Sequence, residues 1–127
     1  MAGTEVLIFA EADGTVPLLE WLSDLPPKVQ DKFIVRIELL QEQGHKLGRP
    51  LAAFLRDNVY ELRVRHMRVN YRILYFFHEG RAVLSHGLTK EAKVPESDIR
   101  RAIRRFEQFS SDAERPVSYT HLTLPTN

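Results

Sequence analysis

Residues 61–77 read ELRVRHMRVNYRILYFF, a stretch in which regular alternation of apolar and polar residues coincides with many arginines. A period of two is the pattern of a β-strand that buries one face. A break at His66-Met67 predicts a turn, so the stretch indicates two antiparallel strands joined as a hairpin. The side chains expected to face the core are Tyr60, Leu62, Val64, Tyr71, Ile73 and Tyr75.

The opposite face of this hairpin is expected to be strongly basic. Its side chains would be Arg63, Arg65, Arg68, Asn70 and Arg72. Clustered like charges repel one another and weaken a sheet, so a bound polyanion would explain the cluster. The guanidinium group is also well shaped to hold a phosphate through paired hydrogen bonds. The alternative is a solvated structural face, with Glu61 as the ion-pair partner that orients Arg72.

The second half of the hairpin's second strand is apolar on both faces, because Leu74, Phe76 and Phe77 interrupt the alternation. This pattern predicts a central strand that is covered on both sides. The expected cover is a last helix beginning near Pro95, with an apolar and a basic face. The apolar positions are Ile99, Ala102, Ile103 and Phe106, and the basic ones are Arg100, Arg101, Arg104 and Arg105.

The segment before the hairpin predicts one strand and two helices. Residues 5–10 form a short apolar run that is typical of a strand. A helix capped by Thr15 is expected next. Pro26-Pro27 would end that helix and start a second one, which would stop at Gly44.

The remaining segments complete the predicted order of elements. Residues 45–58 are expected to form a connection with a short helical turn at 51–55. A turn at 78–81 leads to a third strand at 82–88. The order β-α-α-β-β-β-α indicates an α+β fold, in which an antiparallel sheet packs against a helical hairpin and a C-terminal helix.

The chain has 127 residues, which indicates one domain. We assign that domain to residues 1–109 and interpret residues 110–127 as a linker followed by a non-native or disordered tail. The absence of cysteine excludes disulfides and thiolate metal sites. No apolar run is long enough to span a membrane and no signal peptide is indicated, so a cytoplasmic protein without membrane contact is expected.

The formal charge of +1 conceals an uneven distribution along the chain. Residues 59–105 contain eleven Lys and Arg against five Asp and Glu, whereas residues 1–58 contain six against nine. A basic second half favours a site for a polyanion. Metal-dependent and Ser-His-Asp catalysis are disfavoured, because neither a metal-ligand spacing nor a nucleophile elbow is present.

Several motifs occur together in an order that resembles a known family. They are VYELRVRH at 59–66, VNYRILYFF at 69–77 and GRAVLSHGLTKEAKVPESDIRRAIRR at 80–105. This combination resembles the RelE/HigB group of the RelE/ParE toxin superfamily, specifically its phage-derived branch. The resemblance covers about residues 5–108, and the RelE-like fold that it implies agrees with the order of elements derived above.

The resemblance implies the toxin of a type II toxin–antitoxin system. Such toxins bind in the ribosomal A site and cleave mRNA there, and a small antitoxin protein neutralises them. The implied chemistry needs no metal or cofactor. The ribose 2′-OH attacks the adjacent phosphate, which requires positive charge at that phosphate. The alternative is a non-enzymatic ParE-like toxin that acts on DNA gyrase, or an inactive relic that binds only its antitoxin.

The resemblance also implies roles for individual residues. Arg72 would clamp the scissile phosphate, and Lys90 would act as a base or stabilise charge. The residues implied to contact RNA are Arg63, Arg65, Arg68, Arg81 and Lys93. By their place in the alternation, His86, Tyr71 and Tyr75 are expected to be packed inside the domain.

Overall fold

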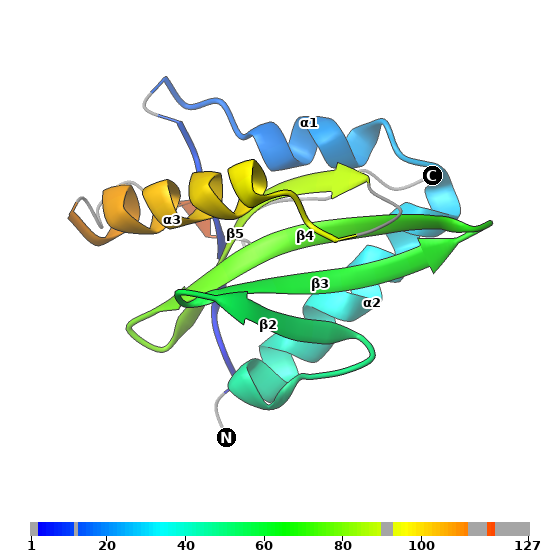
Figure 1. Ribbon diagram of the computed structural model, residues 1–127, viewed down its shortest axis with the longest axis horizontal. Helices are drawn as coiled ribbons and strands as arrows, with labels where there is room; N and C mark the ends of the chain where they lie inside the picture. Colours follow the sequence, from blue (N-terminus) through cyan, green and yellow to red (C-terminus); the bar gives the residue numbers. More distant parts are fainter. Residues whose placement is uncertain (1–2, 12, 90–92, 112–116, 119–127) are drawn as a thin grey trace.

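A computed structural model describes residues 3–11, 13–89, 93–111 and 117–118 of the chain (Figure 1). The strands are β1 (Val6–Ile8), β2 (Ala52–Arg56), β3 (Val59–His66), β4 (Val69–His78), β5 (Arg81–Thr89) and β6 (Val117–Ser118). The helices are α1 (Pro17–Ser23), α2 (Pro27–Gln43) and α3 (Glu96–Ser111), with a 3₁₀ turn η1 at Gly44–Lys46. Lys90 and most of the segment predicted as a tail lie outside the described residues.

The strands form one mixed sheet in the order β2-β3-β4-β5-β1-β6. Strands β2 to β5 are an antiparallel meander, as the alternation predicted for its central hairpin. The α+β class is therefore confirmed. The wholly antiparallel sheet is wrong, because β1 runs parallel to β5 with Val6 aligned to Ala82. Helix α3 ends at Ser111, two residues beyond the predicted domain boundary, and β6 pairs with β1.

The helical turn predicted at residues 51–55 is wrong, because this segment forms strand β2. Leucine and alanine are good helix formers, and their local preference indicated a helix. Pairing with β3 overrides that preference, since Ala52 aligns with Leu62 and Phe54 with Tyr60. Burial of Ala52 and Ala53 against the rest of the domain accompanies the pairing.

The sheet separates two hydrophobic layers, with α1 and α2 on one face and α3 on the other (Figure 1). The larger layer joins the predicted core-facing residues of β3 and β4 to the apolar stripes of both helices. The smaller layer places Phe76 against Phe106 and Phe109, and Leu74 beside Ala102. Both predicted faces of the hairpin and the predicted cover by the last helix are confirmed.

The helical hairpin is closed by a buried side chain of α2. The Nε2 atom of Gln30 donates to the carbonyl oxygens of Leu22, Ser23 and Leu25 at 2.9, 3.3 and 3.1 Å. Leu22 and Ser23 form the C-terminal end of α1, where helical partners run out, and Leu25 follows in the connection to α2. The predicted cap by Thr15 is wrong, because Val16 precedes the helix and the backbone of Thr15 donates to Asp13 instead.

Each of the three antiparallel hairpins in the described residues has a two-residue turn. The central residues are Asp57-Asn58, Met67-Arg68 and Glu79-Gly80, and all six have positive φ. The turn predicted at His66-Met67 is therefore displaced by one residue. His66 ends β3, and Arg68 belongs to the turn rather than to the basic strand face.

Candidate nucleic-acid interface

The basic face predicted for the hairpin lies on the α3 side of the sheet, beyond the end of that helix. Along β4, Leu74 and Phe76 are covered by α3. Arg72 is next on the same face, where β3 places Arg63 directly across from it. The strand is thus apolar where the helix covers it and cationic where the cover stops. This division explains why one short segment carries both kinds of residue.

A buried carboxylate holds the two facing arginines. Oε2 of Glu61 accepts from Nε of Arg63 at 2.9 Å and lies 2.8 Å from its Nη2. Oε1 of Glu61 lies 3.2 Å from Nε of Arg72, an ion pair without good hydrogen-bond alignment. The Glu61 side chain is only 3% exposed, against 31% for Arg63 and 14% for Arg72. The ion pair with Glu61, the structural alternative for Arg72, is present, and Glu61 also pairs with Arg63. The role of Arg72 at a phosphate stays a prediction.

This arrangement leaves positive charge at the surface and compensates it underneath. Two guanidinium groups side by side repel, and one carboxylate between them offsets that repulsion. Because Glu61 pairs with both groups from below, it limits the orientations that the two guanidinium groups can take. Two oriented guanidinium groups that together carry one positive charge in excess of Glu61 form a site suited to a phosphodiester.

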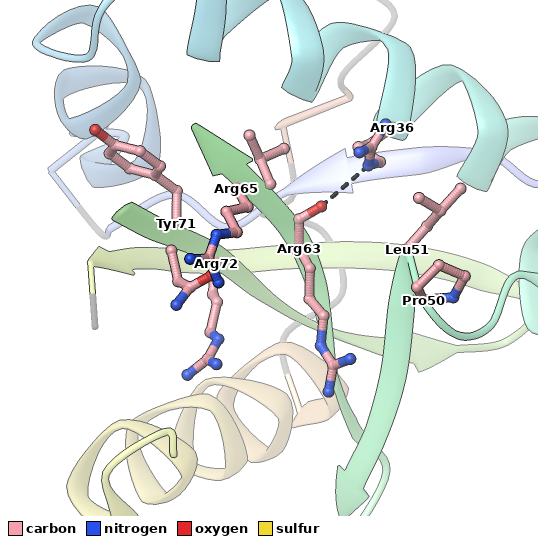
Figure 2. A pocket seen from close by; sticks show the side chains of 9 residues that line it. Arg36, Pro50, Leu51, Arg63, Arg65, Tyr71 and Arg72 are labelled. Atoms are coloured by element: carbon pink, nitrogen blue, oxygen red, sulfur yellow. Dashed lines mark hydrogen bonds between the residues drawn. The ribbon is translucent and has the colours of Figure 1, made fainter. Parts of the chain in front are cut away.

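Helix α2 adds a third arginine, which the sequence analysis missed. Nε of Arg36 donates to the carbonyl oxygen of Arg63 at 3.0 Å (Figure 2). One turn earlier, Lys32 donates to the carbonyl oxygen of Arg65 at 3.3 Å. These carbonyls lie on the edge of β3 beyond the first residue of β2, so the two cations cover an otherwise open strand edge. Partial burial lowers the pKa of Arg36.

A signal for Arg36 was present in the sequence. It lies seven residues after Val29 and three after Phe33, on the apolar stripe that faces the sheet. An arginine on such a stripe requires a buried acceptor or a role at the surface.

Together these residues line a cleft of ≈ 320 Å³ beside the turn end of the β3–β4 hairpin. Its lining residues are Arg36, Pro50, Leu51, Arg63, Val64, Arg65, Asn70, Tyr71 and Arg72. Figure 2 shows the side chains of Arg63 and Arg72 pointing toward the α3 side, whereas Tyr71 points toward the helical hairpin. Tyr71 and Tyr75 are buried as predicted, and burial raises the pKa of Tyr75.

The other predicted RNA contacts are dispersed. Arg65 lines the cleft and is exposed, and Arg68 is exposed at the hairpin tip. Arg81 begins β5 at the opposite end of the sheet, about 20 Å from Arg72 at ~3.3 Å per residue of strand. Lys93 is exposed in the segment before α3. Lys90 lies outside the described residues, so its assignment stays a prediction.

The basic face of α3 divides into two parts. Arg100, Arg101 and Arg104 are exposed and, with Glu96 and Ser97, line a second hollow of ≈ 520 Å³. Arg105 instead packs into the domain. Its Nη1 donates to the carbonyl oxygen of Ser85 at 2.8 Å, its Nη2 donates to Glu11 at 3.1 Å, and its guanidinium lies 4.7 Å from the ring centre of Phe9.

A buried histidine joins α3 to the sheet. Nδ1 of His86 lies 2.8 Å from Oγ of Ser85, and its Nε2 lies 3.2 Å from Oδ1 of Asp98 in the first turn of α3. The packed position predicted for His86 is confirmed. Ser85 has no exposed surface, so this Ser-His-Asp chain is a structural clamp that no substrate can reach. Burial, together with Arg101 and Arg105, lowers the pKa of His86 to about 4.

The clamp predicts a loss of stability in mild acid. Since the folded pKa of His86 is below its ordinary value of 6.5, the unfolded chain binds the proton more readily. The stability that the domain gains from burying a neutral His86 is complete above pH 6.5. It falls as the pH drops toward 4, by about 3 kcal/mol at most. Between pH 7 and 4, the midpoint of thermal unfolding should decline more steeply with falling pH for the natural chain than for His86→Gln. Parallel curves would contradict this origin.

Among the described residues, no group of three or more His, Asp or Glu side chains is placed to hold a metal ion. None of the helices in that part of the chain is both long and apolar enough to cross a membrane.

The fold and the cleft define a small α+β domain with an arginine site next to the β3–β4 turn of its sheet. The chain belongs to the family described as phage derived protein Gp49-like (DUF891), whose model matches residues 20–107. The matched region spans α2, the β2–β5 meander and most of α3. No curated protein matches the chain. The phage-derived part of the resemblance is confirmed, and the RelE/HigB assignment stays a prediction.

Proposed function

We propose that this protein is the toxin of a type II toxin–antitoxin system and cleaves mRNA in the ribosomal A site without a metal ion. It acts in the cytoplasm and is neutralised by a small antitoxin protein. The observation that carries the proposal is the pair of facing arginines, Arg63 and Arg72, held from below by Glu61 at an open cleft. Membership in a phage-derived family and the sequence resemblance to RelE/HigB toxins support it.

The cleft suits a reaction that needs positive charge more than a nucleophile of its own. The ribose 2′-oxygen attacks the adjacent phosphorus and loses its proton to a base, while the bond to the 5′-oxygen breaks and that oxygen gains a proton. The products are a 2′,3′-cyclic phosphate and a 5′-hydroxyl. Charge accumulates on the phosphate oxygens in the transition state, where oriented donors stabilise it most.

In this proposal Arg72 clamps the scissile phosphate and Arg63 supports it, since both guanidinium groups face the same side. Arg65 and Arg36, on the cleft lining, hold the neighbouring backbone. Lys90 serves as the base or as a further positive charge, an assignment that rests on the resemblance alone.

The proposal predicts a large effect of Arg72→Lys on cleavage. Lysine keeps the charge beside Glu61 but cannot offer two parallel donors to a phosphate. We expect mRNA cleavage in a reconstituted translation reaction to fall about 100-fold, the usual effect of losing one transition-state donor. Primer extension on a reporter mRNA gives the cut sites and their yield. Arg56→Lys is the matched control, because Arg56 also pairs with carboxylates but lies away from the cleft.

Four outcomes separate the alternatives. Cuts that need ribosomes, disappear in Arg72→Lys and persist in Arg56→Lys would support the nuclease. Equal cutting by both variants would remove Arg72 from the mechanism. Growth arrest by a folded protein without any cuts would favour a gyrase-directed toxin, and neither arrest nor cuts would favour a relic that binds its antitoxin.

A further inference from the structure

The turn between β3 and β4 departs from the residue preferences that its backbone conformation imposes. Two-residue hairpin turns with positive φ at both central positions favour Asn, Asp and Gly. The β2–β3 turn follows this rule with Asp57-Asn58, and the β4–β5 turn follows it in part with Glu79-Gly80. The β3–β4 turn places Met67 at φ 52° and Arg68 at φ 71°. In this left-handed region the Cβ atom lies close to the following carbonyl oxygen, and Met and Arg lack the local hydrogen bonds by which Asn and Asp offset that contact.

Folding therefore does not explain the choice of Met67 and Arg68. Residues that break a local rule without a structural gain are expected where a protein binds something. The other two turns are matched internal comparisons, since they have the same length and the same signs of φ. They lie elsewhere on the sheet, and the Glu79-Gly80 turn is about 30 Å away, at ~3.3 Å per residue along β4 (Figure 1).

The exposed groups at this tip are one apolar side chain and several cations. Met67 is 82% exposed, the highest value among the exposed large hydrophobic residues of the described chain. The segment from Leu62 to His78 contains no Asp or Glu. The one acid of the hairpin, Glu61, pairs with Arg63 and Arg72 rather than with Arg65 or Arg68. Arg65 also lines the cleft, which makes the tip continuous with the arginine site.

We propose that the β3–β4 tip is a second contact for single-stranded RNA, which continues from the cleft onto the hairpin turn. Met67 packs against the face of an unstacked base, and Arg68 binds the phosphate beside it. Single-strand sites usually combine positive charge along the backbone with aromatic side chains on which bases stack. Here the exposed thioether of Met67 takes the place of an aromatic ring, since its polarizable sulfur contacts aromatic rings favourably. This inference rests on the proposed function and extends it to nucleotides that flank the cleft.

The surroundings of Met67 favour RNA over a protein partner. A protein that docks through apolar contacts needs a continuous apolar patch. The other exposed large apolar residues of the described chain, Val35 and Phe54, lie on α2 and β2 rather than on this turn. A single thioether among cations matches a base flanked by phosphates.

The test measures binding of an unstructured oligoribonucleotide of about 12 nucleotides, within the range of ~4–16 that one small domain covers. Fluorescence anisotropy of the labelled RNA, over a series of salt concentrations, gives the affinity and its salt dependence. The variants are Met67→Asn, Arg68→Gly and, as the matched control, Glu79→Asn at the distant turn. All three place a preferred turn residue at a position with positive φ, so each should raise the thermal midpoint or leave it unchanged.

We expect Met67→Asn to weaken RNA binding about tenfold with an unchanged salt dependence. The packing of Met67 against the base is lost, whereas the positive charge of the tip remains. Arg68→Gly should weaken binding similarly and reduce the slope of log affinity against log salt by ~0.7, the effect of one fewer phosphate contact on a single strand. Glu79→Asn should not weaken binding. Antitoxin capture by the variants, measured in parallel, should be unchanged.

Other results would overturn the inference. If Met67→Asn and Arg68→Gly bind RNA as tightly as the natural chain, the tip is not an RNA contact, whatever the fate of the nuclease proposal. If they lose antitoxin capture but keep RNA binding, the tip belongs to a protein interface. If the tip variants lose RNA binding while the natural chain makes no ribosome-dependent cuts, the RNA contact stands and the nuclease proposal fails.

Discussion

Replacing both Arg63 and Arg72 by alanine is expected to lower the free energy of unfolding by about 3–5 kcal/mol. The Glu61 carboxylate is almost completely buried, and these two arginines are its ion-pair partners. Without them it would remain as an uncompensated charge in the domain or would have to take up a proton. Chemical denaturation followed by circular dichroism measures the loss, and the midpoint should move to a lower denaturant concentration at constant slope.

Two further variants identify the cause of this loss. Adding Glu61→Leu to the double variant removes the buried charge, so a large part of the stability should return. Arg65→Ala, on the same strand but exposed, should change stability by less than about 0.5 kcal/mol. A triple variant as unstable as the double one would mean that the arginines stabilise the sheet by packing and not by compensating Glu61.

The substitution Gly87→Val is expected to destabilise the fold by about 3 kcal/mol. Gly87 lies on β5 directly beneath Trp21 of α1. A Cβ atom at this position would lie 2.2 Å from Cε3 and 2.4 Å from Cζ3 of the indole ring. The ring packs against the main core and contacts Phe33, so it cannot move aside freely. Thermal unfolding should show a midpoint lower by roughly 4 °C per kcal/mol.

The control for this prediction is a glycine with space around it. A Cβ at Gly48 has Lys46 O at 4.0 Å as its nearest neighbour, so Gly48→Ala should leave stability nearly unchanged. Combining Gly87→Val with Trp21→Leu should cost less than the sum of the two single changes, because the shorter side chain leaves room. Strict additivity would show that the contact with Trp21 is not the cause.

The features that the sequence predicted well depend on local periodicity. The pleat of a strand fixes which residues share a face, so the alternation from Tyr60 to Tyr75 predicted both faces of the hairpin without knowledge of its partners. The same reasoning predicted that α3 covers Phe76. Glu61 was predicted as the partner of an arginine, because a lone acid among cations on one strand face has few other roles.

The features that the sequence did not predict depend on contacts between distant segments. Strand β2 begins with Ala52-Ala53, directly after Leu51, and the helical preference of these residues is overcome by pairing with β3. The predicted position of the β3–β4 turn was wrong by one residue, because Met67 and Arg68 are not residues that such turns usually contain. Arg36 was overlooked because its acceptor, the carbonyl oxygen of Arg63, is left uncovered only where β2 starts, opposite Leu62.

The pairing of β1 with β5 determines when the domain can be completed during synthesis. Val6 aligns with Ala82, so the first strand to emerge waits for the last long strand of the meander. Contacts of such long sequence separation form late, since the intervening chain must first be closed into a loop. A nascent chain that ends before β5 therefore has no continuous sheet for α1 and α2 to cover. We expect chains that end before β5 not to fold, and activity to require that β5 is present.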